Sequence, residues 1–209
     1  MFTERLELKF LAVEEAEELL ALRLANREFL EPLEPIRSDG YLTLAGQRTE
    51  IMQSDQGRIR DQGYIYGVRL RENGHLIGRA ALTGLARGPF QNANLGYFLD
   101  ESHNGQGYMT EAVTAVLELA FGKHGLHRVQ AGVMPRNKSS QRVLEKAGFR
   151  REGLAERYLK INGVWEDHML FGITVEDWEQ LQGRSQGPAA EVSGEQAQEL
   201  PTAGEARTR

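Results

Sequence analysis

The fold of this chain is decided by the stretch Leu95-Gly-Tyr-Phe-Leu-Asp-Glu-Ser-His-Asn-Gly-Gln-Gly-Tyr-Met-Thr-Glu-Ala112. It predicts a buried strand, a short turn and the beginning of an amphipathic helix. Gly105 and Gly107 stand where the turn becomes the helix, so unpaired backbone N–H groups and the positive end of the helix dipole would meet an anion there. A Gly-x-Gly before a helix also occurs as a plain tight turn. The motif alone does not decide between these interpretations.

The segments around this stretch predict a strand–helix–strand crossover. A strand from Asn92 to Leu99 comes first, and a strand from His127 to Met134 comes last. Between them, the apolar residues of a helix from Tyr108 to Lys123 fall on one face: Met109, Ala112, Val113, Val116 and Ala120. Two strands joined through a helix of this length should be parallel.

Antiparallel strands are expected outside the crossover, because Asn-Gly turns join neighbouring strand patterns. Asn73-Gly74 joins strands over 64–70 and 75–85, and Asn162-Gly163 joins a strand starting at Phe149 to one over 164–173. The other predicted elements are a strand over 5–10 and helices over 13–29, 44–62, 137–147 and 174–181. Together these elements predict a mixed α/β domain.

The helix over 44–62 is predicted with less apolar surface than the others. Its sparse stripe consists of Leu44, Ile51, Met52 and Ile59. A helix of this composition should lie on the surface or line a cleft.

Composition limits the classes of function. The chain has 209 residues, which suits one domain, here residues 1–182, and a formal net charge of −5, which gives no support to nucleic-acid binding. It contains no cysteine, and we expect a cytoplasmic protein without a signal peptide or a membrane span. Residues 183–209 are rich in Gly, Pro, Ala, Glu and Gln, so we expect a disordered tail.

A second helix start follows the second strand of the crossover. Asn137 is a good N-cap, and Ser140, Val143, Leu144 and Ala147 recur on one face of the helix. The Ser140 hydroxyl therefore shares an inward apolar stripe and must find a partner. It would either bond its own helix backbone or face a cleft beside the first helix. Both helix starts follow the carboxyl ends of crossover strands, where open α/β sheets bind ligands.

In this order and spacing, the motifs resemble those of the acetyl-CoA-dependent GNAT N-acetyltransferases, and most closely the RimJ/RimL type that acetylates ribosomal-protein alanine. The matching motifs are Gly105-Gln-Gly-Tyr-Met-Thr-Glu-Ala112, Asn137-Lys-Ser-Ser140, Val143-Leu-Glu-Lys-Ala-Gly-Phe149, Arg87-Gly-Pro-Phe90, Glu152-Gly-Leu-Ala155 and the segment from Tyr158 to His168. The resemblance covers roughly residues 3–182. It implies the GNAT fold, a mostly antiparallel sheet with a splayed parallel pair at the acetyl-CoA site and helices on both faces.

The resemblance also implies roles for particular residues. Backbone groups of Tyr97, Phe98 and Leu99 would bind the pantetheine arm, and Asn137 would bond it as well. The turn and helix start would hold the pyrophosphate, through Asn104, Gly105, Gln106, Gly107, Tyr108, Met109 and Thr110. Ser140 would protonate the departing CoA sulfur, and no metal is implied. Ser102 departs from the family's Gln or Arg three residues before the first glycine, which would weaken one phosphate contact but leave the backbone donors.

The implied reaction is attack of a neutral amine on the thioester. An α-amine, with a pKa of about 7.8, is neutral far more often at pH 7 than a lysine, with a pKa of about 10.4, a gap of roughly 3.5 kcal/mol. An N-terminal acceptor, such as the alanine of a ribosomal protein, therefore asks less of a base. The sequence leaves five candidates for that base: Glu28, Glu31, Glu166, Asp167 and His168.

Several alternatives remain open at this point. The acceptor could be a small amine such as an antibiotic, a polyamine or an amino acid, and the protein could be a CoA-binding sensor or scaffold without turnover. A nucleotide-binding module is poorly supported, because no P-loop lysine follows the glycines. The sequence leaves open whether the protein is a monomer or a homodimer.

Overall fold

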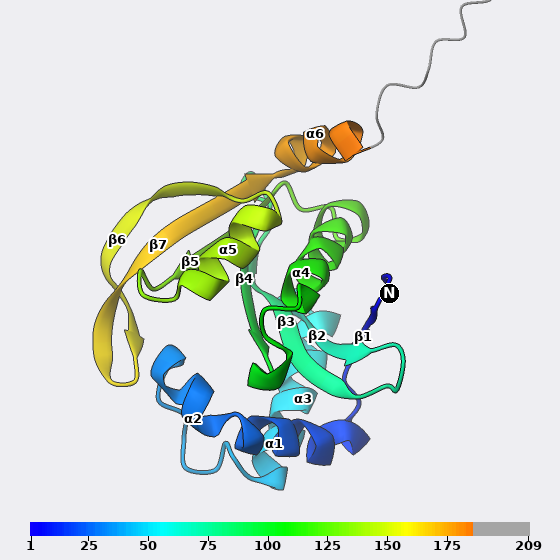
Figure 1. Ribbon diagram of the computed structural model, residues 1–209, viewed down its shortest axis with the longest axis vertical. Helices are drawn as coiled ribbons and strands as arrows, with labels where there is room; N and C mark the ends of the chain where they lie inside the picture. The colour runs from blue at the N-terminus through cyan, green and yellow to red at the C-terminus, as the bar shows by residue number, and fades with distance from the viewer. Residues whose placement is uncertain (186–209) are drawn as a thin grey trace, which may run out of the picture.

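The computed structural model describes residues 1–185 and contains a mixed sheet of seven strands in the order β1-β2-β3-β4-β5-β7-β6 (Figure 1). Neighbouring strands are antiparallel except for β4 and β5, which are parallel. The predicted fold class is therefore confirmed. The strands are β1 (Leu6–Phe10), β2 (Gly63–Leu70), β3 (Leu76–Ala86), β4 (Asn92–Leu99), β5 (Arg128–Val133), β6 (Arg150–Ile161) and β7 (Val164–Thr174).

Helices cover both faces of the sheet. Strand alternation sends Ile77 to one apolar core, with α4, and its neighbour Leu76 to a second core, with α1 and α3. The α-helices are α1 (Ala16–Ala25), α2 (Arg27–Leu30), α3 (Leu44–Ile59), α4 (Tyr108–Glu118), α5 (Lys138–Lys146) and α6 (Val175–Ser185). Short 3₁₀ turns form η1 (Val13–Glu15), η2 (Glu31–Leu33) and η3 (Glu101–His103), and a π-helical turn, η4 (Leu119–Lys123), follows α4.

The main sequence patterns are confirmed. All five apolar residues predicted on one face of the helix from Tyr108 are buried in the larger core. Asn162 and Gly163 both have positive φ, 43° and 84°, as a two-residue hairpin turn requires. The hairpin of β6 and β7 is long and bends past α2 in Figure 1, where the Asn162 N–H donates to the Glu34 carbonyl at 2.9 Å.

The predicted helix over 13–29 is interrupted at Asn26. This residue is 2% exposed, and its Nδ2 donates to the Leu22 carbonyl at 2.9 Å. Its Oδ1 accepts from the Glu101 N–H at 2.8 Å. A side chain bonded in both directions ties α1 to the end of β4, and the chain resumes as α2 and η2. This break depends on a contact between distant segments, so helical periodicity could not reveal it.

The predicted apolar stripe of α3 is partly wrong. Met52 and Ile59 are 48% and 71% exposed, whereas Ile51 is buried. The buried face is completed by Gln47, whose Nε2 donates to the Tyr41 carbonyl at 2.6 Å. A polar residue can occupy an inward position when a backbone group accepts its hydrogen bond.

The parallel pair diverges after a short ladder. β4 and β5 are paired only from Asn92 to Asn94 and from Arg128 to Gln130. Beyond this point β4 remains bonded to β3 and β5 to β7. Each strand therefore keeps one hydrogen-bonded neighbour while the space between the two opens.

The carboxyl-terminal segment is described only in part. Helix α6 extends to Ser185, three residues into the segment expected to be a tail. Residues 186–209, on which the rest of that expectation falls, lie outside the described residues. Within residues 1–185 no helix is both long and apolar enough to cross a membrane.

Candidate active site

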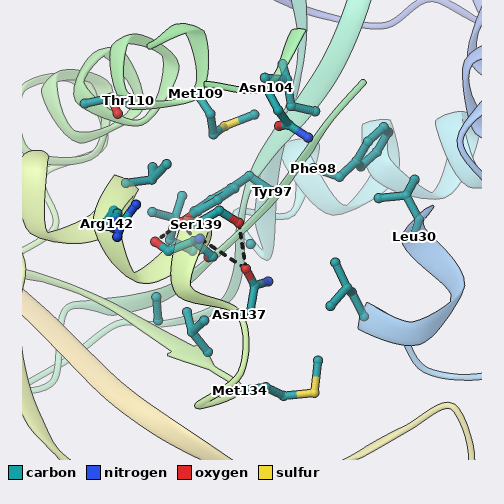
Figure 2. A pocket seen from close by; sticks show the side chains of 18 of the residues that line it. Leu30, Tyr97, Phe98, Asn104, Met109, Thr110, Met134, Asn137, Ser139 and Arg142 are labelled. Carbon is teal, nitrogen blue, oxygen red and sulfur yellow. Dashed lines mark hydrogen bonds between the residues drawn. The ribbon is translucent and has the colours of Figure 1, made fainter. Parts of the chain in front are cut away.

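The diverging ends of β4 and β5 border a cavity of about 440 Å³. In Figure 2, Tyr97 and Phe98 of β4 lie across from Met134, just after β5, and Leu30 of α2 closes one side. The starts of α4 and α5 also line it. The cavity therefore lies where both helix starts of the crossover meet.

Most of the predicted site residues line this cavity. Of the residues implied to bind the cofactor, all except Gln106 contribute to the lining. The Gln106 side chain instead turns back and donates to the Ser102 carbonyl at 3.2 Å. Residues separated by more than forty positions in the sequence, from β4 to α5, thus share one cavity.

The glycine turn presents a row of free backbone donors. Gly105 and Gly107 have φ values of 76° and 85°, in the left-handed region that favours glycine, and Gly107 is the N-cap of α4. The backbone N–H groups from Gly105 to Thr110 donate to no acceptor within the described part of the chain. Such a row at the positive end of a helix can bind an anion.

An arginine from the amino-terminal segment supports this turn. Arg5 Nη1 donates to the Gln106 carbonyl at 3.0 Å, and Arg5 Nε donates to Glu111 at 2.8 Å. Glu111 also accepts from the Thr3 hydroxyl at 2.6 Å. Burial alone would raise the pKa of the Glu111 carboxyl, but the bonds from Thr3 and Arg5 outweigh it and lower that pKa. An ionised Glu111 thus anchors the arginine that contacts the turn.

Two hydroxyl groups in the cavity wall, one on β4 and one on α5, form a hydrogen bond with each other. The Tyr97 hydroxyl lies 2.8 Å from Ser140 Oγ and 3.1 Å from the Ser140 carbonyl oxygen. Burial raises the pKa of the Tyr97 phenol, so the phenol stays protonated and can donate. The partner of the Ser140 hydroxyl is therefore a side chain of another element, and not the serine's own helix backbone.

Asn137 caps the helix that carries Ser140. Its Oδ1 accepts from the Ser140 N–H at 3.1 Å and from the Ser139 hydroxyl at 3.0 Å, as predicted for an N-cap. Figure 2 shows the amide nitrogen of Asn137 pointing away from these partners. The Nδ2 group of Asn137 donates to no acceptor within residues 1–185, so it can donate to a ligand.

The five predicted base candidates differ in their surroundings. Only His168 lines the cavity. Glu166 bonds Arg136 Nη1 at 2.6 Å, and Asp167 accepts from the Arg157 N–H at 2.8 Å. Glu28 and Glu31 are exposed and do not line this cavity, although Glu31 lines a neighbouring cavity.

Sequence reasoning missed several residues of the site. Arg5 lies about a hundred positions before the turn that it contacts, and no local signal indicates the contact. The Tyr97 side chain could have been found, because strand alternation places it on the same face as the buried Leu95 and Leu99. Glu34 also lines the cavity, as an ion pair with Arg23 at 2.8 Å.

Comparison with known proteins gives this geometry a context. Residues 5–150 match the family model described as Acetyltransferase (GNAT) domain. The chain is 49% identical to the probable N-acetyltransferase YjcK of Bacillus subtilis (strain 168), over 81% of this chain and 94% of YjcK. It is 32% identical to the [ribosomal protein uS5]-alanine N-acetyltransferase of Escherichia coli (strain K12), over 84% of this chain and 91% of that enzyme.

A solved structure is similar over the same region. Mycobacterium smegmatis RimJ, determined in complex with CoA-disulfide, superposes with a TM-score of 0.79 at 28% sequence identity. The alignment covers 86% of this chain and 89% of that structure. The similarity therefore extends over most of the chain.

Proposed function

This chain belongs to the GNAT acetyltransferase family and is an acetyl-CoA-dependent N-acetyltransferase, and we propose that its acceptor is the N-terminal amine of a protein. The finer proposal is the N-terminal alanine of a ribosomal protein, the acceptor named for the Escherichia coli relative. The observation that carries the proposal is the cavity itself, which joins a row of free backbone N–H donors to a wall that includes the apolar side chains of Phe29, Leu30 and Leu33.

We assign to acetyl-CoA the part of the cavity that is lined by β4 and by the starts of α4 and α5, which we call the donor half. The free N–H groups from Gly105 to Thr110 fit the pyrophosphate, and the side chains of Arg142 and Lys146 add positive charge at the same wall. The Asn137 Nδ2 group and the β4 backbone fit the amides of the pantetheine arm. Bound acetyl-CoA supplies the activated acetyl group.

Ser140 is the proposed acid. The single proton of the Tyr97 hydroxyl can go to the Ser140 carbonyl oxygen or to Ser140 Oγ, and in the second arrangement, which we propose for catalysis, the serine hydroxyl is free to direct its own proton into the cavity. The sulfur that leaves the thioester needs one proton, and a hydroxyl held by a second hydroxyl can supply it. Tyr97 then acts through Ser140, as a positioning residue.

The part of the cavity next to α2 and η2, which we call the acceptor half, favours a single amine over a polycation. Its walls include Phe29, Leu30 and Leu33. The only carboxylate among the described lining residues is Glu34, and Arg23 bonds both of its oxygens, at 2.8 and 3.1 Å. A polyamine or an aminoglycoside would find no free negative charge in this first cavity, whereas a neutral α-amine requires none there.

A second cavity favours an acceptor that is longer than an amino acid. It measures about 490 Å³, shares Leu30 and Glu34 with the first, and reaches Asn162 at the end of the β6–β7 hairpin. A peptide whose amine lies in the first cavity could extend along this one. We therefore place the acceptor chain between η2 and the hairpin.

The proposal is tested with a panel of amines. Peptides that begin with alanine, serine or methionine, the same peptides with a blocked N-terminus, free amino acids, spermidine and an aminoglycoside are each incubated with acetyl-CoA. Thiol release and product mass are measured. We expect acetylation of the free α-amine, fastest for alanine.

Three other outcomes would contradict the proposal. Turnover of only small amines would replace the peptide with a metabolite as the acceptor. Acetylation of peptide lysines in place of the α-amine would contradict an N-terminal acceptor. Tight acetyl-CoA binding without any transfer would indicate a sensor.

A further inference from the structure

We propose that His168 is the general base that removes the proton of the attacking amine. This inference rests on the proposed acetylation of an amine and adds the residue that activates it. His168 lies on β7, at the wall of the cavity, and is 3% exposed. It belongs to neither of the helix starts that form the donor half.

The imidazole is held in one place by its neighbours. The His168 and Tyr158 ring centroids are 5.6 Å apart, across the β6–β7 hairpin. Gly132 of β5 faces both rings: a Cβ added there would lie 3.3 Å from Tyr158 Cε1 and 3.6 Å from His168 Cδ2. Because glycine has no side chain, Tyr158 and His168 can pack side by side against the β5 backbone, at the point where β5 is no longer paired with β4.

The hydrogen bonding determines which ring nitrogen is free. His168 Nδ1 lies 3.0 Å from the Glu166 carbonyl oxygen, which can only accept, so Nδ1 carries the proton in the neutral ring. The lone pair is then on Nε2. Within residues 1–185, Nε2 has no hydrogen-bond partner. It is also not completely buried, so its lone pair can be reached. Nε2 is therefore an accessible acceptor on a residue that lines the cavity.

The charged groups around His168 are already paired. On β7 the Glu166 carboxylate bonds Arg136 at 2.6 Å, and across the cavity Glu34 bonds Arg23. On β6 the neighbouring titratable group is the Tyr158 phenol. These carboxylates already accept hydrogen bonds from guanidinium groups, so they are less available to an amine. An imidazole with a free nitrogen can accept a proton in this pH range.

The protons balance in the proposed step. The amine nitrogen forms a bond to the thioester carbonyl carbon, the C–S bond breaks, and His168 Nε2 takes a proton from the nitrogen. An α-ammonium group loses two protons on its way to the amide. His168 passes these two protons to solvent one after the other, while Ser140 gives one proton to the departing sulfur and regains one from solvent. One proton is therefore released for each acetyl group transferred.

His168→Gln tests this assignment, because glutamine keeps a polar side chain but cannot act as a base near neutral pH. Steady-state rates are measured from pH 6 to pH 9 with the best amine of the panel, and acetyl-CoA affinity is measured by calorimetry. We expect kcat/KM for the amine to fall at least about 100-fold at pH 7, the usual contribution of a general base. Acetyl-CoA affinity should stay within about twofold, and the deficit should shrink as the pH rises and more of the amine is neutral.

Tyr158→Phe is the matched control, since it keeps the ring beside His168 and should leave the rate unchanged. A second variant, His168→Ala, should regain activity when imidazole is added, which a loss of folding would not do. A His168→Gln enzyme with more than half of the wild-type kcat/KM at every pH would overturn the inference. A drop in acetyl-CoA affinity that accounts for the whole loss of rate, with no rescue by imidazole, would overturn it as well.

These outcomes separate the inference from the proposed function. Wild-type enzyme that acetylates only small amines removes the peptide acceptor but still tests His168 with those amines. A wild type that acetylates a peptide, with a His168→Gln variant that keeps more than half of its kcat/KM, removes His168 alone. A wild type that acetylates no amine at all removes both.

Discussion

Tyr97→Phe removes one hydroxyl from the cavity and leaves the β4 backbone in place. The hydroxyl makes contacts of 2.8 Å with Ser140 Oγ and 3.1 Å with the Ser140 carbonyl oxygen. A net contribution of about 1–1.5 kcal/mol for orienting Ser140 corresponds to a 5- to 12-fold fall in kcat. Without this partner the serine hydroxyl is expected to turn toward its own helix backbone. The KM for acetyl-CoA should not change, because the proposed cofactor contacts of Tyr97 are backbone groups.

The assay is initial-rate thiol release at saturating peptide, for Tyr97→Phe, Ser140→Ala and the double variant. If Tyr97 acts through Ser140, the double variant should be no slower than Ser140→Ala. Tyr66→Phe is the matched control, because it also removes a buried hydroxyl, bonded to His124 at 2.7 Å and away from the cavity. Full kcat in Tyr97→Phe, or independent losses that multiply in the double variant, would refute the reasoning.

Three further predictions concern other parts of the molecule. Gly107→Ala places a side chain at a φ of 85°, a backbone conformation that costs about 1 kcal/mol for a residue other than glycine. We therefore expect the affinity for acetyl-CoA, measured by calorimetry, to fall about fivefold. The control Gly57→Ala, in α3, should leave this affinity unchanged. Burial, and after it the charge of Lys123, lowers the pKa of His124, so the unfolded chain binds a proton at a higher pH than the folded protein does. The stability of the wild type should therefore fall as the pH drops below about 6.5. His124→Asn should lose less Tm on acidification, and an equal loss in both proteins would contradict this account. Arg69→Met leaves the carboxylates of Glu15 and Glu18 without their buried partner. We expect the free energy of unfolding to fall by about 2–3 kcal/mol and the Tm by roughly 5–10 °C. An unchanged Tm would contradict this prediction.

Much of the donor half of the site could be predicted because its signals are local. A positive φ favours glycine, so Gly105 and Gly107 indicate the turn by themselves. Asn137 caps the helix three residues before Ser140, and this spacing is visible in the chain. The resemblance to GNAT proteins depended on the same short motifs. The residues proposed to bind the cofactor remain a prediction, although all except Gln106 line one cavity.

The acceptor half was harder to predict because its residues belong to distant segments. Glu34 follows α2, His168 lies on β7, and nothing in the sequence near either residue indicates that they share a cavity. Five base candidates were equivalent in the sequence. They became distinct only when the ion pairs of Glu166 and the free ring nitrogen of His168 were known.

The sequence by itself determined most of the elements of this protein, since helix stripes, hairpin turns and caps each depend on residues within a few positions of one another; the break at Asn26, which depends on a distant contact, is an exception. The stretch from Leu95 to Ala112 could therefore be assigned as strand, turn and helix without knowledge of its neighbours. Only the tertiary structure decided where β4 and β5 separate, because each strand exchanges its hydrogen bonds for those of β3 or β7, elsewhere in the chain. That separation created the cavity, and sheet pairing brought Tyr97, Ser140 and His168 to its walls.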